Sequence, residues 1–207
     1  ARKCKFCFPA LQKLRSTPIS ILKNEVKINL KSGQKGIILH GEDIFLYQSD
    51  GFNVNGDAVT GLFREIYNIP GVKWVSASHA SLSSVASSPE TVEKISKILQ
   101  LGTKLHPTKS FQVGIETGSA RLINKLMKGK VYPFTPEDWL DVVIEGFNIL
   151  TKNHIIPCST VILGLPGETE DDIQKTINLI KQLNKYPSLV VPIFFTPMPV
   201  SYTHLTL

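Results

Sequence analysis

The 207-residue sequence has no apolar run of the ~18 residues that a transmembrane helix requires. The basic residues at its start are not followed by the apolar stretch of a secretory signal peptide. Its three cysteines are an odd number with two closely spaced, which argues against a secreted disulfide framework and favours a reducing cytosol. Internal repeats and low-complexity linkers are also absent. We therefore expect a cytoplasmic protein of one main domain with no membrane partner.

The composition is that of an ordinary globular chain, with 42% hydrophobic and 19% charged residues. A net charge of +6 would suit an anionic partner such as RNA or a phosphorylated substrate. The basic residues are scattered, however, and no aromatic ladder for stacking bases accompanies them. RNA is therefore only weakly indicated by charge.

Two cysteines, Cys4 and Cys7, stand among the basic residues Arg2, Lys3 and Lys5. Thiolates at this spacing can turn toward one centre, and soft sulfur ligands select iron–sulfur clusters, zinc or dithiol redox chemistry. The pair alone leaves these three alternatives open. Because it lies among charges and not among apolar residues, two structural thiols without a ligand are disfavoured. A chain that begins inside such a motif is expected to lack its true N-terminus.

Short apolar runs alternate with helical periodicity along the rest of the chain. Strands that recur every ~30–50 residues with helices between them predict right-handed βαβ units and a parallel sheet, in an α/β fold. A doubly wound sheet and a barrel both remain open. The predicted strands are 36–39, 72–77, 111–115, 159–163 and 189–195, and the predicted helices begin at 19, at Asp57, at 88–89, at Ser119, at 135 and at Thr169.

Polar residues and glycines follow the predicted strands, at the edge where ligands bind in either architecture. Glycines at strand-to-helix turns let the backbone approach a ligand, although turn geometry alone can require them. Glu168 can equally complement a helix dipole, and Cys158 can be a small core residue. His40, His79 and His106 lack a partner at ligand spacing. The candidates are Gly41, Glu42, His79, Glu116, Gly118, Ser119, Gly164 and Glu168.

Four motifs occur in a recognisable order: CKFC at 4–7, HGED at 40–43, GIETGSARLINKLMKGK at 114–130 and ILGLPGETEDD at 162–172. The residues of these motifs, their order and their spacing resemble those of the radical S-adenosylmethionine superfamily. Within the superfamily it is most similar to the methylthiotransferase-like and cobalamin-associated branch. The resemblance covers residues 1–199.

The resemblance implies a [4Fe–4S] cluster held by a CxxxCxxC triad, whose open iron binds the amino and carboxylate groups of S-adenosylmethionine. Cys4 and Cys7 match the second and third cysteines. The first would fall one residue before Ala1, so this chain by itself is not expected to hold the cluster properly.

The resemblance also implies cofactor-binding residues. Glu42, with Gly41, matches a GGE motif that binds the amine of S-adenosylmethionine, with His40 in place of the first glycine. Glu116 and Ser119 match polar positions for its ribose and carboxylate. Gly164 ends the stretch that packs on adenine, and the aromatic Phe6 lies between the two cysteines.

The fold implied is a partial (β/α)6 TIM-like barrel, with residues 1–199 as its core domain and its first strand upstream of the chain. Residues 200–207 depart from the family and are a tail of doubtful origin. The implied activity is reductive cleavage of S-adenosylmethionine to a 5'-deoxyadenosyl radical that abstracts hydrogen from an unknown substrate, for methylthiolation or methylation. RNA is a candidate substrate, and flavodoxin or ferredoxin a candidate electron donor. The resemblance also leaves open whether a cobalamin-binding domain accompanies this chain in the full-length protein.

Two other functions remain as alternatives. A zinc-stabilised binding module would use the CxxC pair and two further ligands, for which Cys158 and the five histidines are the available residues. A phosphate-binding α/β barrel enzyme would use the glycine turns alone, and it leaves Cys4 and Cys7 unexplained.

Overall fold

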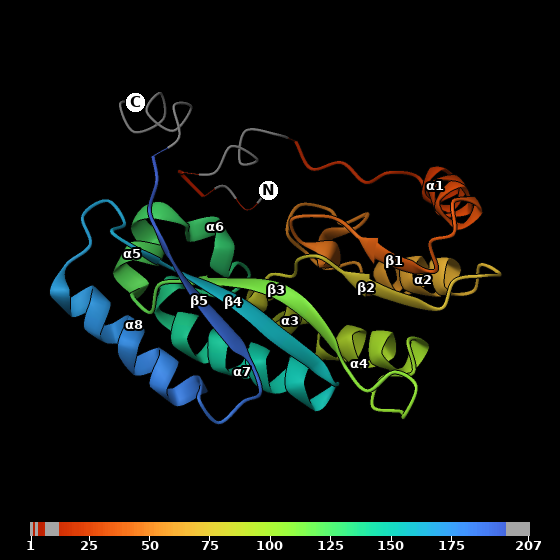
Figure 1. The fold of residues 1–207 in the computed structure, drawn as a ribbon. Coiled ribbons are helices and arrows are strands. Elements are labelled where there is room, and N and C mark those ends of the chain that lie inside the picture. Colours follow the sequence, from red (N-terminus) through yellow and green to blue (C-terminus); the bar gives the residue numbers. More distant parts are fainter. Residues whose placement is uncertain (1, 3, 7–12, 198–207) are drawn as a thin grey trace.

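The computed structural model describes residues 2, 4–6 and 13–197 (Figure 1). The predicted ligand Cys7 and the tail 200–207 lie outside the described residues. The elements are α1 (Ile19–Lys31), β1 (Gly36–Leu39), η2 (Ile44–Leu46), α2 (Gly56–Tyr67), β2 (Trp74–Ala77), α3 (Leu82–Ser87), α4 (Pro89–Ile98), β3 (Lys109–Glu116), α5 (Ala120–Leu126), α6 (Lys128–Val131), η3 (Pro136–Asp138), α7 (Trp139–Lys152), β4 (Ile155–Leu163), α8 (Glu170–Leu183) and β5 (Leu189–Phe194).

Within the described residues, five parallel strands follow one another in chain order. β1 pairs with β2, and β3, β4 and β5 form a second group. The two groups meet where Gln112 donates its N–H to the Ser78 carbonyl and accepts from the Ala80 N–H, each at 2.9 Å. Strand order without a reversal is that of a barrel and not of a doubly wound sheet. The partial barrel is therefore confirmed.

Side chains on β3 alternate between two environments, as a pleated strand requires. Phe111, Val113 and Ile115 are at most 2% exposed and face the helical layer. Figure 1 shows α7 and α8 on one side of β3, β4 and β5. Gln112, Gly114 and Glu116 face the other side and line a cavity. The core therefore lies between strands and helices, and the inner face of the barrel stays open to a ligand.

Several helices begin at the residues that the sequence predicts. Ser119 accepts a hydrogen bond from the Leu122 N–H at the start of α5, and Thr169 forms a capping box with Asp172 at the start of α8. The predicted cap Asp57 is wrong, because Asn55 caps α2 by accepting from the Ala58 N–H at 3.1 Å.

Three elements differ from the sequence prediction because they depend on distant contacts. α3 was not predicted; its buried Leu82 packs so close to Gly146 of α7 that a Cβ there would lie 2.8 Å from Leu82 Cδ2. β4 begins at Ile155, before the predicted Ser159, because its first residues pair with β3. The helix that follows Ser119 ends at Leu126, and a separate short helix, α6, contains Gly129.

No helix in the described ranges is both long enough and apolar enough to cross a lipid bilayer.

Candidate active site

A cavity of about 640 Å³ opens on the inner face of the barrel, at the carboxyl ends of its first strands. It is within the size range of pockets that enclose a cofactor-sized molecule, ~300–1,000 Å³. Five predicted site residues line it: Cys4, Gly41, Glu42, His79 and Glu116. Other polar residues of its lining are Arg2, Lys13, Arg15, His40, Asp43, Lys130, Cys158 and Thr160.

Cys4 reaches this cavity from the N-terminal segment and is half-buried. The next residue, Lys5, donates its backbone N–H to the Leu126 carbonyl at 2.9 Å. Phe6 does not line the cavity; its ring packs edge-on against Phe195, with centroids 5.9 Å apart. The thiol of Cys4 is therefore held at the mouth of the barrel by its neighbours in sequence.

At the exit of β1, Gly41 and Glu42 lie beside two histidines. The His40 and His79 rings meet edge-on at 5.8 Å, so residues that are isolated in the sequence form a pair in the fold. Burial lowers the pKa of His79 and the neighbouring His40 lowers it further, while Glu42 opposes them. His79 Nδ1 is buried and has no hydrogen-bond partner among the described residues. A neutral imidazole with an unsatisfied nitrogen in the cavity wall is suited to bind a polar ligand.

Glu116 ends β3 with its carboxylate in the cavity. One oxygen accepts from Lys130 Nζ at 2.9 Å, and the other accepts from Thr160 Oγ1 at 3.0 Å. Its φ of +63° is in a region that side chains seldom adopt, next to a bulge in the β3–β4 pairing. Gly114 leaves the space that the carboxylate occupies, since a Cβ there would lie 2.0 Å from Glu116 Oε1. The backbone is thus shaped to present Glu116 inward.

Ser119, by contrast, lies outside the cavity lining and is fully buried. Its hydroxyl donates to Asp172 of α8 while also capping α5. Arg121 forms an ion pair with the same carboxylate. The hydrogen bond from Arg121 is the largest cause that holds the pKa of Asp172 well below its usual range, assisted by Ser119 and Thr169 against the opposing effect of burial. In this conformation the Ser119 hydroxyl joins α5 to α8.

Gly164 also lies outside the cavity lining. Its φ of +81° is favourable only for glycine, and its N–H donates to the Glu168 carboxylate at 2.7 Å. Glu168 therefore stabilises the turn after β4, and it lies two residues before the first residue of α8.

Sequence reasoning missed several cavity residues: Arg2, Asp43, Lys130 and Thr160. Their partners are distant in the chain, as with Arg2 and Asp43, which are 41 positions apart. The one available signal was the alternation along β4, which places Thr160 on the same face as Cys158.

An α/β barrel with a thiol and two carboxylates at its mouth is the architecture of a cofactor-dependent barrel enzyme. The family model described as Radical SAM superfamily matches residues 1–180. The chain therefore belongs to the radical SAM superfamily, which is a family of enzymes.

Among curated proteins, the chain is similar to bacterial methylthiotransferases. It is 28% identical over 187 residues to the tRNA-2-methylthio-N(6)-dimethylallyladenosine synthase of Fusobacterium nucleatum, covering 87% of this chain and 38% of the relative. It is 26% identical over 207 residues to the threonylcarbamoyladenosine tRNA methylthiotransferase of Aquifex aeolicus, covering 98% and 42%. It is 28% identical over 189 residues to the ribosomal protein uS12 methylthiotransferase of Clostridioides difficile, covering 88% and 38%. The chain spans about two fifths of the length of these relatives.

The described residues fit the two groups that this family binds. Cys4 brings a soft thiol donor to the cavity, as an iron–sulfur cluster requires. Glu42 and Glu116 offer carboxylates to a cationic ligand, and the orphaned His79 Nδ1 offers a further polar contact. Among the described residues no three His, Cys, Asp or Glu side chains gather around one point.

Proposed function

We propose that this chain is the core of a radical SAM methylthiotransferase-like enzyme, in which Cys4 and Cys7 are ligands of a [4Fe–4S] cluster. The observation that carries the proposal is the position of Cys4 on the same cavity as Glu42 and Glu116. When bound, the reduced cluster would supply the electron that cleaves S-adenosylmethionine to methionine and a 5'-deoxyadenosyl radical, and that radical would abstract hydrogen from the substrate.

The chain's own residues would hold and orient the cofactor. Glu42, at the exit of β1, would bind its cationic amine, and the backbone at Gly41 would allow the close approach. Glu116, held by Lys130 and Thr160, would accept hydrogen bonds from hydroxyl groups such as those of a ribose. The barrel wall would exclude bulk water from these contacts, which strengthens each of them.

Three further residues have proposed roles near the cofactor. Gly164 ends the stretch proposed to pack on adenine, and Phe6 lies between Cys4 and Cys7 in the sequence. Ser119 would act on the site through the start of α5, since its hydroxyl is engaged by Asp172.

The substrate class is proposed from the relatives, whose names specify tRNA or a ribosomal protein. We propose methylthiolation or methylation of an RNA or protein substrate in the cytoplasm, with flavodoxin or ferredoxin as electron donor. The basic residues Lys13 and Arg15 in the cavity lining are compatible with an anionic substrate. A cobalamin domain elsewhere in the full-length protein would be used if the outcome is methylation.

The test is iron, sulfide and cofactor cleavage in the full-length protein, the gene product in which this chain occurs, purified without oxygen. Reduction with dithionite in the presence of S-adenosylmethionine should yield 5'-deoxyadenosine. Cys4→Ala should remove the cluster iron and abolish this product. Cys158→Ala, which removes the third thiol, is the matched control and should keep its iron.

Zinc in place of iron and sulfide would overturn the proposal and favour a zinc-stabilised module. Thermal stabilisation by inorganic phosphate without iron would favour a phosphate-binding barrel enzyme. A second variant, Glu42→Ala, should keep the cluster but weaken binding of S-adenosylmethionine, and unchanged binding would remove Glu42 from the site.

A further inference from the structure

Arg2 is a buried cation in the segment that carries Cys4. Only 8% of its surface is exposed, and it lies two positions before Cys4, which lines the cavity. Arginine is almost never buried to this extent unless its charge is paired, because desolvation of the guanidinium is costly. The partners of Arg2 therefore indicate why the segment adopts this position.

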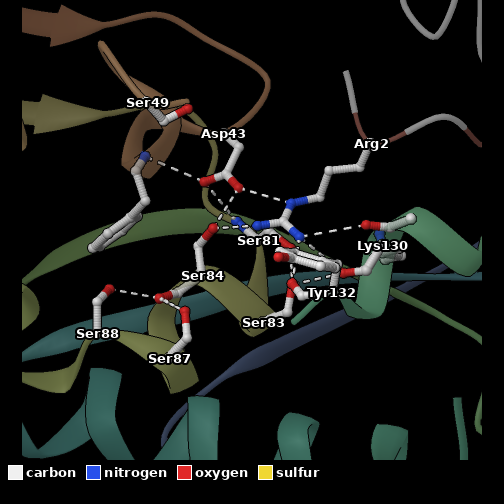
Figure 2. Close-up of polar contacts among 12 residues, drawn as sticks. Arg2, Asp43, Ser49, Ser81, Ser83, Ser84, Ser87, Ser88, Lys130 and Tyr132 are labelled. Atoms are coloured by element: carbon white, nitrogen blue, oxygen red, sulfur yellow. Dashed lines mark hydrogen bonds and ion pairs between the residues drawn. The ribbon is translucent and has the colours of Figure 1, made fainter. Parts of the chain in front are cut away.

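Every nitrogen of the guanidinium has a described acceptor (Figure 2). Nε donates to Asp43 Oδ2 at 3.0 Å, Nη1 donates to the Tyr132 carbonyl at 2.8 Å, and Nη2 donates to Ser84 Oγ. The guanidinium also lies over the Phe52 ring, 5.5 Å from its centroid. One side chain thereby contacts the exit of β1, helix α3 and the end of α6.

Both oxygens of the Asp43 carboxylate also accept hydrogen bonds. Oδ1 accepts from the backbone N–H groups of Phe45 and Ser81, each at 3.2 Å. Oδ2 accepts from Arg2 and from Ser84 Oγ, the latter at 2.7 Å. The carboxylate thus ties the exits of β1 and β2 to the N-terminal segment, and it does so from the position next to Glu42.

The backbone on either side of Cys4 is fixed by separate contacts. The Arg2 carbonyl lies so close to α6 that a Cβ at Gly129 would be 2.2 Å from its oxygen. The Lys5 N–H donates to the Leu126 carbonyl at 2.9 Å. The same α6 carries Lys130, the partner of Glu116, so one short helix contacts the thiol segment and one cavity carboxylate.

We propose that Arg2 and Asp43 form a positioning pair, which holds the Cys4 thiol in register with Glu42 and Glu116 and so sets how the cluster and S-adenosylmethionine meet. This inference rests on the proposed function. Neither residue is required to touch the reacting atoms; the pair acts through Cys4 and through the β1 exit. A fixed fork of five donors is what arginine offers here and lysine does not.

The test compares Arg2→Lys, Asp43→Asn and the double variant in the anaerobic full-length protein. Arg2→Lys keeps the charge but loses the fork, and Asp43→Asn keeps the shape but loses acceptors. Because residues that orient a metal ligand typically contribute ~10–100-fold to metal affinity, each single variant should lower cluster affinity by at least about 10-fold. The electron paramagnetic resonance spectrum of the reduced cluster should also respond less to added S-adenosylmethionine. Since the two residues act together, the double variant should be no worse than the more impaired single variant.

Ile95→Ala is the stability control, since Ile95 is fully buried in α4 and does not line the cavity. It should lower the melting temperature without changing the cluster spectrum or its midpoint potential. If Arg2→Lys and Asp43→Asn behave in the same way, with lower melting temperature and unchanged spectra, the pair is merely structural and the inference is overturned.

A readout without metal separates this inference from the proposed function. The full-length protein without metal is compared with its Arg2→Lys variant, both carrying Cys7→Ser. Cys4 should react with iodoacetamide more slowly in the protein that keeps Arg2, as measured by peptide mass spectrometry. If the wild-type protein binds no iron but its Cys4 is still alkylated more slowly than that of the Arg2→Lys variant, the proposed function is contradicted and the positioning pair is supported. Equal alkylation rates in the two proteins would overturn the positioning pair, even if the full-length protein binds the cluster.

Discussion

Lys130 Nζ lies 2.9 Å from a carboxylate oxygen of Glu116, and this ion pair joins α6 to the end of β3. The two side chains are 13% and 15% exposed, so both charges are largely withdrawn from water. The pair explains how a carboxylate can be held at an unusual backbone angle inside the cavity. It also makes α6 part of the wall of the site.

Lys130→Met should therefore destabilise the fold, because it leaves the Glu116 charge partly buried without its cation. The expected loss in the free energy of unfolding is about 1–3 kcal/mol, measured by urea denaturation at pH 7. The double variant Lys130→Met with Glu116→Gln should recover part of this loss, since it removes both charges. Lys128→Met, an exposed neighbour in α6, is the control. Equal stability of the two lysine variants would show that the ion pair contributes nothing.

Asp172 makes stability depend on pH. Its folded pKa is depressed below the unfolded value of about 3.9, so the unfolded chain binds more protons and stability falls as pH falls. The stabilisation is present above about pH 4 and is lost as pH drops toward the folded pKa. Asp172→Asn should cost about 1–3 kcal/mol at pH 7, and the difference from wild type should shrink when unfolding is measured at pH 3. Asp171→Asn, an exposed neighbour, should cost little at either pH, and a pH-independent cost for Asp172→Asn would contradict this account.

Gly129 and Gly61 are a matched pair of helical glycines with different surroundings. A Cβ at Gly61 would meet nothing within 4 Å, whereas one at Gly129 would lie 2.2 Å from the Arg2 carbonyl. Gly61→Ala should raise the free energy of unfolding by about 0.5–1 kcal/mol through helix propensity. Gly129→Ala should show no such gain and should speed hydrogen exchange at the Lys5 amide, because the N-terminal segment is displaced. A gain in stability equal to that of Gly61→Ala would mean that α6 does not contact this segment.

The sequence predicted those parts of the fold that depend on local chemistry. The capping residues Ser119 and Thr169 identify helix starts because each bond spans only three positions. The choice between a barrel and a doubly wound sheet depends on which strands pair, and no local pattern carries that information. α3 could not be predicted for the same reason, since it is stabilised by packing on α7 and not by its three serines.

In the candidate site, too, the sequence predicted the residues that lie in motifs but not the distant residues that contact them. Glu42 and Glu116 were predicted from motifs, and both reach the cavity because parallel strands bring their carboxyl ends together. The residues that hold them were not predicted: Asp43 and Arg2 are 41 positions apart, and Thr160 is 44 positions from Glu116. Ser119 shows the reverse problem, because its motif indicates a ligand role while its hydroxyl is engaged in a buried contact between helices.

The final prediction concerns β5, whose apolar side chains are unusually exposed. Phe194 is 82% exposed and Ile193 is 42% exposed, and within the described residues β5 pairs on one edge only, with β4. An apolar strand with a free edge is a template for association between chains. The 207-residue chain alone should therefore self-associate with rising concentration in analytical ultracentrifugation.

Phe194→Lys should shift this equilibrium toward the monomer, because a lysine on an edge strand opposes pairing by charge repulsion. Leu105→Lys is the control, since Leu105 is 77% exposed but lies in the connection before β3 and not on an edge. An equal effect of the two substitutions would attribute the association to general surface hydrophobicity. An effect confined to Phe194→Lys would identify β5 as the edge through which the chains associate.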